Sequence, residues 1–235
     1  MRSGGELALA ARAGIRQLTS DLETRRKVVK TAYVSCLTVL VAAAAGAQTP
    51  SGAPTTRSAN GTVLPADQQI AAAVLPLPAD LRANATVLGY DPTGRFVTLR
   101  DGTGAMTCLA SNPKMSQFHV ACYHKSLEPF MARGRELRAQ NQSITREQVD
   151  SVRFLEARAG KLKLPKEPAA LYSLTGGSYD PSTKSANGAR PLFVIYVPFA
   201  TAESTGLSAR PAGPGVPWIM GGGTPKAHIM FTPNM

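Results

Sequence analysis

The sequence is poor in charged and aromatic residues, and it lacks the residue spacings that mark the common enzyme and metal sites. Of its 235 residues, 17% are charged and 6% are aromatic, and there is one tryptophan. It has no CxxC or HxxxH pair and no serine in a GxSxG motif. The glycine run at 221–223 lacks the GK[ST] ending of a phosphate-binding loop. None of these motif-defined enzyme classes is therefore indicated.

Long apolar runs are also missing. The run Thr31–Ala45 has about 15 residues, whereas a membrane-spanning helix needs roughly 20. Basic residues precede this run, and an Ala-x-Ala sequence follows it. This pattern predicts an export signal over residues 1–47 that is cleaved between Ala47 and Gln48. We expect the mature chain to have no transmembrane anchor and to be periplasmic or extracellular.

The basic part of the signal is Thr24-Arg25-Arg26-Lys27-Val28-Val29-Lys30. It resembles the twin-arginine export motif, with Val-Val in place of the usual Phe-Leu, and the polar lead before it also suits that class. The resemblance implies export through the route that reads Arg25 and Arg26. The alternative is a general secretory signal behind a mis-assigned start codon.

The mature chain is expected to open with a flexible leader. Residues 48–69 are rich in Pro, Ser, Thr, Gly and Ala and have almost no large apolar residues, so they cannot bury enough surface to fold. Asp67–Leu75 is predicted to be a short helix that ends before Pro76 and Pro78, and residues 70–235 are predicted to form a single domain.

The hydrophobic pattern of that domain predicts an α+β fold. Four alternating segments between residues 85 and 123, separated by DPTG and DGTG turns, indicate an antiparallel meander. Two amphipathic helices follow, from about Ser126 and from a capping box at Thr145–Gln148. Their predicted buried stripes are Leu127, Phe130, Met131 and Leu137 in the first and Val149, Val152 and Leu155 in the second.

Four more strands are predicted after the helices, one of them over Leu171–Thr175. The KLKL segment at 161–164 alternates like an edge strand. The apolar segment 192–199 is expected in the middle of the sheet with both faces covered, and 227–231 is expected to return as a last strand. The predicted architecture is an antiparallel sheet, made of a meander plus this central apolar strand, with two helices packed on one face.

Cysteine and histidine side chains are the main candidates for chemistry. Strand alternation points both Cys108 and Cys122 toward the core, so in an exported protein they are expected to form a disulfide. A zinc or copper site made of Cys108, Cys122, His124 and His228 is the alternative, because thiolate and imidazole are the ligands that these metals prefer. With the disulfide, no cofactor is expected.

A hydrolase would use His124, Ser126 and Glu128 near the start of the first helix, where backbone N–H groups could hold an oxyanion. Ser126 and Glu128 are also the residue types that stabilise a helix N-terminus. Because three polar side chains in one turn diverge, the structural role is preferred.

The charge pattern limits the choice of partner. The net charge is +11, and residues 125–166 contain ten basic and five acidic side chains. Only two aromatic residues, Phe130 and Phe154, lie in this stretch, too few to interleave with the charge for base stacking, and nucleic acid is not expected outside the cytoplasm. An anionic component of the cell envelope suits the sign of the charge.

The segment CYHKSLEPFMARGRELRAQ, residues 122–140, resembles a family of exported bacterial proteins that has no assigned activity. The resemblance spans residues 70–235, implies export and a single domain, and contributes no catalytic residue. The first hypothesis is therefore an exported, soluble, non-catalytic domain that binds a partner or ligand at the cell envelope. The alternative is a metal-dependent or thiol enzyme centred on Cys108, Cys122 and His124.

Overall fold

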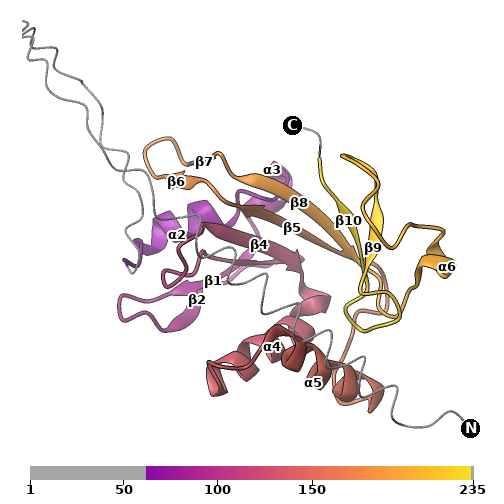
Figure 1. The fold of residues 1–235 in the computed structure, drawn as a ribbon. Coiled ribbons are helices and arrows are strands. Elements are labelled where there is room, and N and C mark those ends of the chain that lie inside the picture. The colour runs from indigo at the N-terminus through magenta and orange to yellow at the C-terminus, as the bar shows by residue number, and fades with distance from the viewer. Residues whose placement is uncertain (1–61, 234–235) are drawn as a thin grey trace, which may run out of the picture. The chain divides into compact units, whose positions relative to one another are not determined.

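A computed structural model describes residues 62–233 of the chain (Figure 1). The predicted export motif at Arg25 and Arg26, the cleavage site between Ala47 and Gln48, and most of the predicted leader lie outside the described residues. Within residues 62–233, no helix is both long enough and apolar enough to cross a bilayer.

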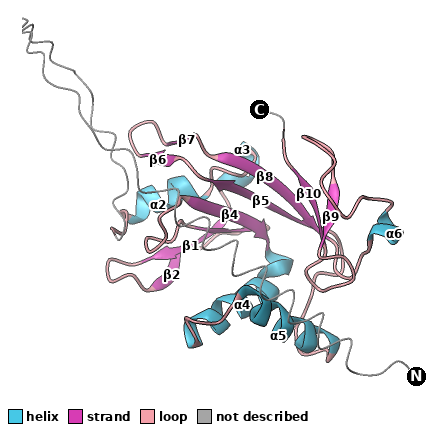
Figure 2. Ribbon diagram, in the orientation of Figure 1, coloured by secondary structure: helices cyan, strands magenta, loops and turns pink. Residues whose placement is uncertain are grey.

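The described residues form an α+β fold in which most strand pairs are antiparallel (Figure 2). The helices are α2 (Ala66–Ala73), α3 (Ala79–Arg82), the 3-10 turn η1 (Lys125–Leu127), α4 (Glu128–Gln140), α5 (Arg146–Arg158) and α6 (Ala202–Thr205). The strands are β1 (Thr86–Tyr90), β2 (Phe96–Arg100), β3 (Met106–Leu109), β4 (His119–His124), β5 (Ala169–Thr175), β6 (Ser178–Asp180), β7 (Ser185–Asn187), β8 (Arg190–Tyr196), β9 (Trp218–Met220) and β10 (His228–Phe231).

Eight strands form one sheet in the order β2-β1-β3-β4-β5-β8-β10-β9, and β6 and β7 form a separate hairpin. The predicted meander is wrong at one strand pair, that of β2 with β3. Strand β2 turns back to the outer edge of the sheet, so β3 pairs with β1 instead, and that pair is parallel. The last strand was predicted correctly, because β10 pairs with β8 and β9.

The two faces of β4 pack against different helices, because its side chains alternate. Cys122 and Cys108 pack with Ala73, Val74 and Leu77 at the end of α2 in one apolar cluster. Tyr123 packs on the opposite face with Leu127 of η1 and Met131 of α4. The sheet is therefore covered from both sides at β4.

Helix α4 also contacts the sheet through Phe130, whose ring lies 6.2 Å from that of Tyr196 in β8. Helix α5 packs on α4 and begins with the predicted capping box, in which Thr145 and Gln148 exchange hydrogen bonds. Its predicted buried stripe is wrong at one of three positions, since Val152 is partly buried. Val149 is buried, but Leu155 is 67% exposed and the buried position is taken by Arg153.

Two further strand predictions need correction. The KLKL segment at 161–164 is irregular chain and not an edge strand. Strand β8 lies in the interior of the sheet as predicted, but its two faces are not both covered, since Phe193 is 38% exposed.

The short helix predicted over Asp67–Leu75 is present as α2, which begins before the domain boundary predicted at residue 70. Helix α2 starts at Ala66, and Gln69 is buried. The Gln69 amide donates to the carbonyl oxygens of Leu64 (2.7 Å) and Tyr90 (2.8 Å) and accepts from the Tyr90 N–H (2.9 Å). One side chain thereby fixes the start of α2 against the end of β1.

Candidate functional site

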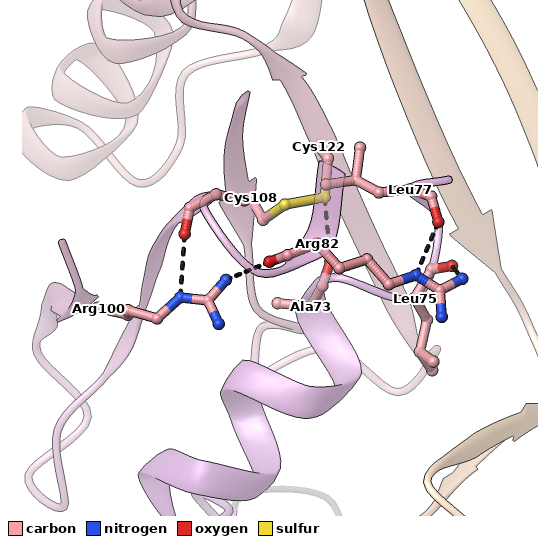
Figure 3. The surroundings of a disulfide bond; sticks show 8 residues. Ala73, Leu75, Leu77, Arg82, Arg100, Cys108 and Cys122 are labelled. Carbon is pink, nitrogen blue, oxygen red and sulfur yellow. Dashed lines mark hydrogen bonds between the residues drawn. A yellow bond between two sulfur atoms is a disulfide. The ribbon is translucent and has the colours of Figure 1, made fainter. Parts of the chain in front are cut away.

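The predicted cysteine pair is joined by a disulfide in the centre of the sheet (Figure 3). Cys108 on β3 lies directly opposite Cys122 on β4, and both residues are fully buried. The Cys122 sulfur lies 3.1 Å from the carbonyl oxygen of Ala73. This is a sulfur–oxygen contact, because a disulfide sulfur has no proton to donate.

Two arginines brace the chain around this bond (Figure 3). Arg82 donates to the carbonyl oxygens of Leu77 (2.7 Å) and Leu75 (3.0 Å). Arg100 donates to those of Ala85 (3.0 Å) and Arg82 (2.7 Å). These carbonyl groups lie at or just after the ends of α2 and α3, where C=O groups lack partners within the helix, so both arginines act as structural supports.

The metal hypothesis is not supported by the positions of its four residues. Both sulfurs are bonded to each other, so neither is a thiolate ligand. His228 lies on β10, separated from β4 by β5 and β8, which places it about 14 Å away at the usual strand spacing. Its ring stacks on Tyr196, on the face opposite Cys122. No group of three His, Cys, Asp or Glu side chains within residues 62–233 is arranged to hold a metal ion.

Only two of the three residues of the hydrolase hypothesis lie together in the structure. His124 Nδ1 lies 2.8 Å from the Ser126 hydroxyl and accepts from the Ser126 N–H (3.3 Å), so it caps η1. Glu128 is bound elsewhere, since it accepts from the Tyr123 hydroxyl (2.5 Å) and pairs with Arg135. Without a third group to orient His124, the arrangement is a helix cap and not a triad.

Tyr123, Glu128 and Arg135 form a polar network under α4. Arg135 also donates to the Tyr123 hydroxyl (2.9 Å) and lies over the ring of Phe96 (5.6 Å). Burial, together with the bond to Glu128, raises the pKa of the Tyr123 phenol. The phenol therefore stays protonated and acts as a fixed donor linking β4 to α4.

A cleft of about 640 Å³, here called the aromatic cleft, lies beside α2. Its wall contains three aromatic side chains, Tyr90, Phe118 and Tyr179, and none of its lining residues is charged. The ring of Phe118 stacks on that of Tyr179 at 6.4 Å, which ties the β6–β7 hairpin to the chain before β4. The full lining is residues 62–64, 69, 72, 90, 110–113, 115, 116, 118 and 177–179.

The aromatic cleft also carries polar groups with unused hydrogen-bonding capacity. Three hydroxyls of the lining make no hydrogen bond within residues 62–233, those of Ser116, Ser178 and Tyr179. None of the three oxygens is fully buried without a partner, so each is open to the cleft or to solvent. Asn112 uses its side-chain oxygen to hold the Lys114 N–H (2.9 Å), which leaves its amide donors free of partners in the described chain. The cleft thus offers flat apolar surfaces beside neutral donors and acceptors, the usual composition of a small-molecule site.

Sequence patterns did not indicate this cleft. Its walls come from four separate stretches of the chain, and the segment between the third and fourth strands of the predicted meander, residues 111–116, was predicted only as a loop. No protein-family model matches the chain, and no curated protein or solved structure matches it either.

Proposed function

We propose that the protein is an exported, non-catalytic binding domain of the cell envelope, and that its ligand is a neutral saccharide held in the aromatic cleft. The observation that carries this proposal is the uncharged lining, in which three aromatic rings stand beside hydroxyl and amide groups that have no hydrogen-bond partner within residues 62–233. Sugar rings present flat C–H faces to aromatic rings and hydroxyls to neutral polar groups. A charged ligand would find no counter-ion there.

Two features support export and a non-catalytic role. The first is the predicted signal over residues 1–47. The second is the Cys108–Cys122 disulfide, because stable disulfides are typical of oxidising compartments. The alternative, a metal-dependent or thiol enzyme, needs both sulfurs as thiolates, and the disulfide removes them.

Calorimetric titration with neutral trisaccharides, chitotriose N-acetylated at each ring and maltotriose, tests the proposal. An anionic trimer of galacturonate serves as the charged comparison. We expect a neutral trisaccharide to bind and the anionic trimer to bind at least about tenfold more weakly, because desolvating an unpaired charge is costly.

Variants locate the site. Phe118→Ala should weaken binding at least about fivefold, since loss of a central aromatic contact costs more than about 1 kcal/mol. Phe193→Ala is the matched control, because Phe193 is also aromatic and partly exposed but lies outside the cleft. If no neutral trisaccharide binds, or if both variants bind like the wild type, the proposal is wrong.

A further inference from the structure

Arg153, in the middle of α5, is a buried cation that makes no hydrogen bond to any described residue. It is 8% exposed, and its Nε is the one buried side-chain nitrogen or oxygen within residues 62–233 that lacks a partner. The nearest acid is Asp150, whose Oδ1 lies 3.8 Å from Nη1, beyond hydrogen-bonding distance. The guanidinium is therefore buried without a hydrogen-bond partner among the described residues.

The position of the guanidinium is fixed by α4. It lies over the ring of Phe130, 4.2 Å from the ring centre. It also touches the α4 backbone at Gly134, where an added Cβ would collide with Nη2. Since apolar residues of similar volume usually serve as well or better at buried positions of this kind, packing alone does not explain an arginine here.

Arg153 lines a cleft of about 710 Å³, here called the α5 cleft, between α5 and the β9–β10 turn. Its other charged lining residues are Arg146, Glu147, Asp150 and Lys226, so the charges sum to one excess positive charge. Asp150 is already paired with Lys226. Arg153 is thus left with unused donors in a cleft whose size is typical of small-molecule sites.

Apart from Ser151 and Thr224, the uncharged lining of the α5 cleft is apolar. Phe154, Leu155 and Met220 line it, and Leu155 and Met220 are 67% and 40% exposed. Large apolar side chains this open to solvent on opposite walls favour an apolar occupant. The planar fork of an arginine matches the two oxygens of a carboxylate, and one excess positive charge balances one carboxylate.

We propose that the α5 cleft is a second binding site, and that it takes a small amphipathic monocarboxylate, of the fatty-acid type, with its carboxylate on Arg153 and its chain against Leu155 and Met220. Asp150 is paired with Lys226, which leaves the donors of Arg153 for the carboxylate. This site is separate from the aromatic cleft and does not depend on it.

The test is calorimetric titration of the whole protein with decanoate, with acetate as the headgroup without a chain and decanol as the chain without a charge. Decanoate should bind at least about tenfold more tightly than either comparison, because only decanoate uses both parts of the cleft. The Arg153 Nε–H signal in nitrogen-proton NMR, assigned by its loss in Arg153→Lys, should shift on titration. A purely structural arginine would not respond.

Three variants make the test specific. Arg153→Met and Leu155→Glu should each weaken decanoate binding about tenfold or more, the first by removing the fork and the second by repelling the carboxylate. Arg158→Met is the matched control, because Arg158 is on the same helix but outside the cleft lining, and it should bind decanoate normally. Leu155 is exposed, so Leu155→Glu keeps the test valid even if Arg153→Met does not fold.

Equal binding of decanoate and decanol, an unmoved Arg153 signal, or full binding by Leu155→Glu would each overturn the proposal. Binding of acetate as strong as that of decanoate would overturn it too, since the site would then recognise an anion without using its apolar wall.

Discussion

Reduction of the Cys108–Cys122 bond should remove a defined part of the stability of the domain. The two cysteines are 14 residues apart in sequence. Opening a loop of this length restores chain entropy to the unfolded state worth about 3 kcal/mol. Oxidised and reduced protein contain the same side chains, so their difference isolates the crosslink. In urea this corresponds to a midpoint lowered by about 1–2 M for a typical denaturant slope.

Fluorescence of Trp218 is a suitable probe, because it is the one tryptophan and is buried in β9, far in strand order from the disulfide. Reduction itself should be slow in native buffer and should accelerate with urea, since both sulfurs are fully buried and become accessible only when the sheet opens. Equal urea midpoints for the two forms, or rapid reduction without denaturant, would refute this reasoning.

Three further outcomes are expected from urea titrations of the same kind. Gln69→Leu should cost about 2 kcal/mol or more, because it leaves the backbone N–H and C=O of Tyr90 without partners; a loss below about 0.5 kcal/mol would contradict the bracing role. Thr145→Ala should cost about 1 kcal/mol through the lost cap of α5, whereas Ser143→Ala, just outside the helix, should be nearly neutral. Burial lowers the pKa of the His228 imidazole, so its contribution is complete above the unfolded pKa of about 6.5 and is lost as the pH falls below it; stability should decline from about pH 7 to about pH 5, and less so in His228→Gln.

Local patterns predicted where strands and helices form, because each depends on neighbouring residues. The capping box at Thr145–Gln148 is of this kind, and so is the strand alternation that points Cys108 and Cys122 toward the core. Strand order is different, because it depends on which edge a returning strand joins. The turn after β1 is compatible with β2 on either side of it, so the parallel β1–β3 pair could not be read from the sequence.

The buried stripe predicted for α5 was wrong at Leu155 for a related reason. Helical spacing placed Leu155 in the core, but Phe130 and Gly134 of α4 receive the guanidinium of Arg153 instead. Which side chain of α5 is buried therefore depends on the shape of a second helix, α4. Likewise both clefts are assembled from segments distant in sequence, and their lining residues include ordinary Ser, Asn and Met side chains that no spacing rule singles out.

The most direct test of the account is the intact mass of the protein recovered from the exported fraction, measured with and without reductant and together with elemental metal analysis. The account predicts a chain that starts at Gln48, has no bound metal and gains the mass of a pair of hydrogen atoms on reduction, as a single disulfide requires. Stoichiometric zinc or copper with both thiols reduced would contradict it and would favour an enzyme centred on Cys108, Cys122 and His124.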